Sequence, residues 1–203
     1  MIEFLIGSSL AASAGLNAWM PLFLLGLADR LLPAMSLPAG WAWLSSDPAL
    51  WIAGALLVLE IVADKIPALD SVNDVIQSIL RPAAGGIAFG AGSGAQTVAV
   101  EDPSPFFTDN TWVPVAVGIG IALVVHVAKA TIRVAANATT GGVAAPVLST
   151  AEDGASFALA AAAILLPALA ALLLIGLLVG IVLVVRRATR RRRPRPAGPP
   201  ATG

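Results

Sequence analysis

The longest apolar segment without a charge, residues 155–185, constrains the fold more than any other part of the chain. As one helix it would measure about 45 Å at 1.5 Å per residue, whereas the core of a bilayer is about 30 Å thick. We therefore expect it to cross a membrane with a tilt, with a kink at Pro167, or after continuing from a buried loop.

Four further apolar segments lie at residues 2–32, 49–66, 82–100 and 112–137. The mean hydropathy is +0.88 and 12% of the residues are charged, against about 25% in a soluble domain. Continuous apolar runs are not the alternating segments of a membrane β-barrel. The pattern predicts an all-α fold, a polytopic transmembrane helical bundle of about five spans. The small, polar middle of residues 2–32 favours close packing or a broken or re-entrant segment.

Basic residues are concentrated at the C-terminal end. Residues 186–203 are rich in Arg and Pro, which predicts a disordered tail after a transmembrane domain of residues 1–185. The positive-inside rule places this tail in the cytoplasm. With five spans, segments 49–66 and 112–137 then run parallel, and both head outward.

Ionisable side chains inside the apolar segments need partners. A charge that faces lipid at a helix centre costs about 2.5 to 3.5 kcal/mol, so we expect these groups to pair or to meet water. Glu60 and Asp64 share one helical face, with Lys65 beside them. Segment 112–137 carries a complementary face, because its polar residues repeat every three or four positions. These residues are His126, Lys129, Arg133 and Asn137.

The two charged faces are predicted to meet in the outer leaflet and to form one polar cluster. Residues 71–81 are expected to form a short amphipathic turn before Pro82, as the outer lip of a cavity. The predicted rim of this cavity consists of Asn17, Asp70, Asp74, Arg81, Glu152 and Asp153.

Glycines spaced four apart predict close helix contacts. Gly86, Gly90 and Gly94 form one such series, and Gly176 and Gly180 form another. Small residues at this spacing let two helices approach closely. A homo-oligomer formed through these faces is therefore one expected assembly, in addition to the lipid bilayer as a partner.

Composition excludes several kinds of chemistry. The chain has no cysteine and one histidine, so disulfides, thiolate sites and thiol catalysis are excluded and a zinc site is not expected. We assign no catalytic or metal-binding residue, no cofactor and no nucleic-acid partner. A membrane-embedded enzyme would need a nucleophile near His126, for which Ser71 and Ser149 are candidates.

Two functions fit the cluster better than an enzyme. The first is a pathway or pocket for a small solute or an ion, a transporter or channel that is proton-coupled if His126, Glu60 or Asp64 changes protonation. The alternative is a structural or scaffold membrane protein whose intramembrane ion pairs only hold helices together.

The same residues carry a resemblance to a family. The motifs are Gly15-Leu-Asn17-Ala, Leu59-Glu60 with Ala63-Asp64-Lys65-Ile-Pro67, Asp70-Ser71 with Asp74, Arg81-Pro82, His126 with Lys129-Ala and Arg133, Asn137, and Leu148-Ser149 with Glu152-Asp153. Over roughly residues 1–180 the chain resembles bacterial membrane proteins grouped as a domain of unknown function (DUF4126). A Ser-Pro-Glu-Pro-like turn is expected after the Asn, where this chain has Ala138-Thr-Thr-Gly-Gly142. The resemblance implies a multi-pass protein of the bacterial cytoplasmic membrane and no established activity.

Overall fold

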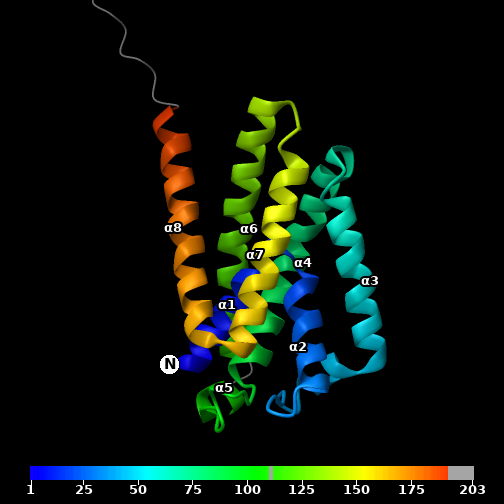
Figure 1. Ribbon diagram of the computed structural model, residues 1–203, viewed down its shortest axis with the longest axis vertical. Helices are drawn as coiled ribbons and strands as arrows, with labels where there is room; N and C mark the ends of the chain where they lie inside the picture. The colour runs from blue at the N-terminus through cyan, green and yellow to red at the C-terminus, as the bar shows by residue number, and fades with distance from the viewer. Residues whose placement is uncertain (110–111, 192–203) are drawn as a thin grey trace, which may run out of the picture.

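Helices make up most of the chain that the computed structural model describes, residues 1–109 and 112–191 (Figure 1). Side chains are described except those of residues 67–72, 74, 108, 109, 185 and 188–191. The elements are α1 (Ile2–Leu16), α2 (Trp19–Leu31), the 3-10 helix η1 (Ala42–Ser45), α3 (Asp47–Ala63), α4 (Pro67–Ser93), α5 (Pro105–Asp109), α6 (Trp112–Thr140), α7 (Ala145–Leu165) and α8 (Pro167–Arg191). In the described residues β structure is limited to two isolated bridges. The all-α fold class is confirmed.

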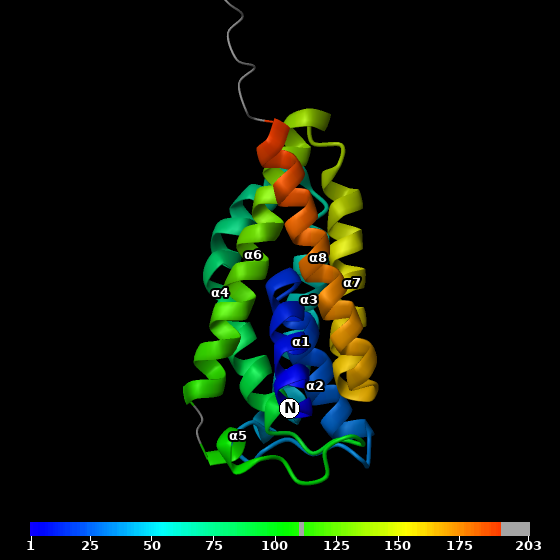
Figure 2. The ribbon, with the colours of Figure 1, turned by 90° about the vertical axis from the view of Figure 1, so that its left-hand side faces the viewer.

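The first two helices form a hairpin that enters and leaves the bundle at the same end. α1 rises from the N-terminus to the middle of the bundle, and α2 descends from there (Figure 1, Figure 2). With 15 and 13 residues, they measure about 22 and 20 Å. Neither length matches a bilayer core of roughly 30 Å. The segment 2–32, expected to be one span, therefore forms two short helices with a break between them, and neither is among the candidate spans in the described residues.

Asn17 reverses the chain between these two helices. Its backbone is extended, with φ −143° and ψ 119°. Its side-chain Oδ1 accepts hydrogen bonds from the N–H groups of Trp19 at 3.2 Å and Met20 at 3.1 Å. Pro21 follows in the first turn of α2, where a residue without an N–H leaves no donor unpaired. The local sequence is thus suited to starting a helix in the middle of the protein.

α4 runs without interruption through the region that we expected to be a separate turn. Residues 71–81 and Pro82 all belong to it, so the predicted break before Pro82 is wrong. A proline inside a helix removes one backbone hydrogen bond, and here packing against α6 and α1 holds the helix together across it. Asp70 and Asp74 lie on this helix, but their side chains are outside the described residues.

The apolar segment 155–185 forms two helices instead of one. Leu166, with φ −144° and ψ 71°, turns the chain sharply, and Pro167 begins α8 at the position where proline is favoured. α8 therefore returns to the end of the bundle where α6 meets α7 (Figure 1). It continues to Arg191, so helix extends into the start of the expected tail, and residues 192–203 lie outside the described residues.

Three helices in the described residues are long and apolar enough to cross a membrane, Trp112–Thr140, Ala145–Leu165 and Pro167–Val184. The last is 6% buried inside the protein, as expected for a helix that faces lipid. The chain is therefore a membrane protein by helix length and composition. α3 and α4 run along the same axis (Figure 1), and the count of about five spans stays a prediction.

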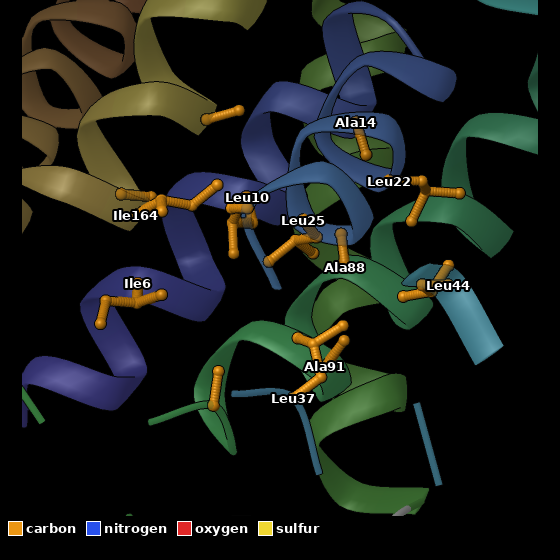
Figure 3. Packing of buried hydrophobic residues seen from close by; sticks show 14 of the residues in the cluster. Ile6, Leu10, Ala14, Leu22, Leu25, Leu37, Leu44, Ala88, Ala91 and Ile164 are labelled. Atoms are coloured by element: carbon orange, nitrogen blue, oxygen red, sulfur yellow. The ribbon is translucent and has the colours of Figure 1, made fainter. Parts of the chain in front are cut away.

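The apolar core occupies the half of the bundle that contains the α1–α2 hairpin. Ile6, Leu10 and Ala14 of α1 pack with Leu22 and Leu25 of α2 (Figure 3). The same core also includes Leu37, Leu44, Ala88, Ala91 and Ile164. Its burial fixes the hairpin against α4 and α7, so the hairpin tip points toward the other half of the bundle.

Glycines bring α4 and α6 into close contact. A Cβ on Gly85 would overlap Ala122, and a Cβ on Gly118 would overlap the Gly85 carbonyl and lie 2.5 Å from Phe89 Cβ. The predicted series also packs within the chain: a Cβ on Gly86 would lie 3.0 Å from α6 side chains, and those on Gly90 and Gly94 would each lie 2.9 Å from a side chain. Gly176 and Gly180 have nothing within 4 Å, and a homo-oligomer through them stays a prediction.

We predict that Gly118→Ala lowers the free energy of unfolding by about 1–3 kcal/mol, because the added methyl overpacks the α4–α6 contact. Thermal unfolding of the purified protein in detergent measures this. Gly120→Ala is the control, since its Cβ would meet nothing within 4 Å. Equal stability of the two variants would contradict the close contact.

Candidate functional site

Arg81 is the centre of a buried network of charged side chains. It lies on α4 and is fully buried, at 0% exposure. Its Nη2 donates to Glu60 Oε1 at 3.0 Å and to Asp64 Oδ2 at 3.3 Å, and its Nε lies 3.3 Å from Glu60 Oε1. The Arg81 guanidinium therefore links α4 to the two carboxylates at the C-terminal end of α3.

Asp64 connects α3 to α6 as well. Its Oδ2 lies 3.3 Å from Lys129 Nζ and 3.4 Å from Arg133 Nη2. Its other oxygen, Oδ1, accepts from Asn73 Nδ2 at 2.6 Å. With Arg81, three cationic side chains surround this carboxylate, which is 1% exposed.

Two acids of α7 complete the network. Glu152 accepts from Arg133 Nη2 at 2.6 Å and lies 3.1 Å from Lys129 Nζ. Asp153 accepts from Lys65 Nζ at 3.1 Å and from Asn17 Nδ2 at 3.0 Å. The described network thus contains four carboxylates and four cations, of which three of each form one continuous set of ion pairs, while Lys65 and Asp153 form a separate pair beside it. The carboxylates are those of Glu60, Asp64, Glu152 and Asp153, and the cations are those of Lys65, Arg81, Lys129 and Arg133.

The network also binds the two helix ends at the tip of the hairpin. Ala18 N–H, at the start of α2, donates to Glu60 Oε2 at 3.1 Å. Lys129 Nζ donates to the carbonyl of Leu16, the last residue of α1, at 2.8 Å. A helix N-terminus carries partial positive charge and a C-terminus partial negative charge. Each end therefore faces a side chain of opposite charge.

His126 lies on the α4 side of the network. Its Nδ1 is 3.1 Å from Arg81 Nη1, and its Nε2 is 3.2 Å from Ser78 Oγ. A guanidinium has donors only, so Nδ1 must be the accepting nitrogen. The neutral ring then carries its proton on Nε2, which donates to Ser78.

A groove on the α4–α6 face reaches this histidine. Its volume is about 520 Å³, and it is lined by Ser78 together with Leu123, His126, Val127, Ala130, Thr131 and Val134. His126 itself is 3% exposed. The ring is therefore covered, while its hydrogen-bond partner Ser78 is exposed at the groove.

Unpaired polar atoms lie one helical turn from the network, toward the α6–α7 connection. They are Gln77 Oε1, Asn137 Oδ1 and Ser149 Oγ, all buried and without a hydrogen-bond partner. Gln77 precedes Arg81, Asn137 follows Arg133 and Ser149 precedes Glu152, each by one turn on its own helix. Because α4 and α7 run opposite to α6 (Figure 1), all three are displaced in the same direction. Such atoms commonly bind water or a ligand.

The structure brings together most of the residues predicted from the sequence, but it exchanges several roles. Glu60, Asp64, His126, Lys129 and Arg133 lie in the cluster. Lys65, expected in the cluster, lies at its edge with a side chain 37% exposed. Asn137 is near the network, and its Oδ1 makes no hydrogen bond.

Three residues expected at the rim lie inside instead. They are Arg81, Glu152 and Asn17. Asp153 lies at the edge with Lys65, while the side chains of Asp70 and Asp74 are outside the described residues. Ser78, Asn73 and the hairpin backbone were not predicted. The spacing of Ser78 and Arg81, three residues apart on one helix, was the available signal.

The position of the network along the bundle also differs from expectation. We expected it at the end opposite the C-terminal arginines. The turn at Leu166 instead sends α8 back, so its last residues lie at the end toward which the network is displaced (Figure 1). The network and the start of the basic tail therefore share one half of the molecule.

We predict that Arg81→Met lowers the free energy of unfolding by about 3–5 kcal/mol, because it leaves Glu60 without its buried ion-pair partner. Adding Glu60→Gln should restore part of this loss. Arg30→Met, which removes an exposed ion pair with Asp47, is the control and should cost no more than about 1 kcal/mol. Equal losses for Arg81→Met and Arg30→Met, measured by unfolding in detergent, would contradict the central position of Arg81 in the network.

Comparison with known proteins gives one result. No curated protein and no solved structure matches the chain. The model of the family described as "Domain of unknown function (DUF4126)" matches residues 4–187, which is most of the chain. The chain, with its charged network at the tip of a helical hairpin, belongs to this family of unknown function.

Proposed function

We propose that the protein is a transporter or channel for a small solute or an ion, with its site at the tip of the α1–α2 hairpin. We place it in the bacterial cytoplasmic membrane, with its C-terminal arginines in the cytoplasm in accordance with the positive-inside rule. The observation that carries the proposal is the pair of helix ends buried in the bundle beside Glu60 and Lys129.

Broken helices of this kind serve a known purpose in membrane transport. In many transporters, half-helices end near the middle of the bilayer, where their N-termini face anionic groups and exposed carbonyls face cations. Here Glu60 and Lys129 occupy those two positions. A transported ion or charged solute that replaced either side chain would find the backbone N–H of Ala18 or the carbonyl of Leu16 already oriented to bind it.

We call the three side chains with unpaired atoms above the network the polar rim, which differs from the rim expected from the sequence, and they support access from the end where α6 meets α7. Gln77, Asn137 and Ser149 provide two amide oxygens and a hydroxyl without partners. A polar atom left unpaired in the interior costs about 1–3 kcal/mol, and water or a polar solute would remove that cost. A hydrated rim directly beside Arg133 and Glu152 is what a transport pathway needs.

The structural alternative rests on the completeness of the pairing. Every described carboxylate and cation of the network has a partner of opposite charge, and these pairs join α3, α4, α6 and α7. The same contacts would hold the bundle together without transport. The transport proposal is favoured by the unpaired rim and by the groove at His126, since neither is needed for helix packing.

The geometry of His126 argues against a serine hydrolase. In a catalytic Ser-His pair, Nε2 must accept the serine proton while a carboxylate holds the Nδ1 proton. Here Arg81 donates to Nδ1, so Nε2 donates to Ser78. Ser149, one of the two candidate nucleophiles, makes no hydrogen bond, and the side chain of Ser71 is outside the described residues.

We predict that Glu60→Gln abolishes flux across proteoliposomes that contain the purified protein. The amide keeps an oxygen for Ala18 N–H but removes the charge that pairs with Arg81. A screen of protons, monovalent cations, anions and metabolites with the unchanged protein first identifies what moves. Glu101→Gln, in an exposed loop, should transport normally.

Folding has to be measured in the same samples, by size exclusion and thermal unfolding. The proposal requires that Glu60→Gln remain folded while its flux is lost. If the unchanged protein moves nothing in the screen and Glu60→Gln unfolds, the network is structural.

A further inference from the structure

We propose that the proton is the ion that drives or accompanies this transport, and that it reaches the network from the α4–α6 groove through His126. The inference rests on the transport function proposed above and names its ion. It starts from two contacts of one imidazole, Arg81 on one side and the groove residue Ser78 on the other.

The first step is that Arg81 and a proton compete for the same nitrogen. Nδ1 of His126 holds the lone pair that accepts from Arg81 Nη1 at 3.1 Å. A proton can bind the neutral ring only at that lone pair, so Arg81 must first move away. The route requires water in the groove: uptake transfers one proton from hydronium there to Nδ1, which gives an imidazolium and leaves one water molecule, and no other covalent bond changes.

The second step concerns the charges that face the ring. Among the described side chains these are Arg81 of α4, Lys129 of α6 and Asp64 of α3, whose Oδ2 contacts both cations. α1 has no ionisable side chain in this half of the bundle, and the charges of α8 are the arginines at its C-terminal end. An imidazolium would repel Arg81 and Lys129 at short range. Once Arg81 has left Nδ1 and the ring is protonated, this repulsion prevents Arg81 from returning.

The third step links this movement to the hairpin. Arg81 Nη2 bonds Glu60 Oε1 at 3.0 Å, and Glu60 accepts from Ala18 N–H at 3.1 Å. Displacement of Arg81 would leave Glu60 with the hairpin N–H and without its ion pair. A proton taken up from the groove thus leaves an unneutralised carboxylate, that of Glu60, beside the N-terminus of α2.

The groove gives the proton its route. Ser78 is exposed and lies 3.2 Å from Nε2, while the other lining residues are mostly apolar. A hydroxyl both donates and accepts, so it can pass a proton between groove water and the ring. Rotation of the ring, once Arg81 has moved, would turn Nδ1 toward the same side.

The chain offers a direct test because His126 is its only histidine. Nitrogen NMR of protein labelled with ¹⁵N-histidine should show one ring, with the proton on Nε2 and Nδ1 unprotonated at neutral pH. Ser78→Ala should change the Nε2 resonance. A ring with its proton on Nδ1 would overturn the inference, because Arg81 could not then donate to it.

The functional test uses His126→Gln in proteoliposomes under an imposed pH gradient, with a pH-sensitive dye inside. Glutamine can accept from Arg81 and donate to Ser78, but it cannot bind a proton. We expect proton flux to fall by about a hundredfold with the unfolding temperature retained. Thr139→Val, an exposed change on α6 that removes hydrogen bonds only to its own helix, should transport normally.

The outcomes separate the inference from the transport function. Proton flux that persists in His126→Gln, or solute flux of the unchanged protein that ignores the pH gradient, overturns the proton route and leaves transport standing. The absence of any flux from the unchanged protein removes both. If His126→Gln fails to fold, the same flux assay on Ser78→Ala decides, and an unchanged proton flux there also overturns the route.

Discussion

The break in the hairpin at Asn17 is the constraint on which the rest of the structure depends. Two helix ends that stop inside a membrane protein leave backbone donors and acceptors that lipid cannot satisfy. Asn17 satisfies two donors, Glu60 a third, and Lys129 the Leu16 carbonyl. Glu60 and Lys129 are charged, so they in turn need partners, which α4 and α7 supply. The hairpin and the charged network are therefore one arrangement.

An arrangement of this kind has two possible consequences, and the chemistry of the network favours one of them. A fully paired, charge-balanced core holds helices rigidly together. Such a core also responds to binding. One added proton or ion changes the ion pairs and hydrogen bonds of every group that shares a partner with the group it binds. Arg81 is the shared partner of Glu60, Asp64 and His126. The groove reaches His126, and the unpaired atoms of the rim lie one helical turn from Arg81, Arg133 and Glu152.

The sequence predicted the network better than the path of the chain. Helical spacing and the cost of charge in lipid were enough to place Glu60 and Asp64 near Lys129 and Arg133, because both arguments are local. The turns at Asn17 and Leu166 were not predictable in this way. Asn17 with Pro21, and Leu166 before Pro167, fit a kink as well as a reversal, and distant packing decides between them. Arg81 was assigned to the rim for the same reason, since its central position depends on α4 being continuous.

Transport through the network requires that water reach it. Cysteine labelling can measure this access without interference, because the chain has no cysteine of its own. Ser149→Cys places a near-isosteric thiol at the rim, and Ala160→Cys places one at an equally buried apolar position further along α7. Labelling with a membrane-impermeant thiol reagent, applied from either side in native membranes, measures access at each position. We expect reaction at position 149 and none at position 160, because water reaches only the rim. Equal protection of both would mean that the network is sealed and serves only to hold the helices together.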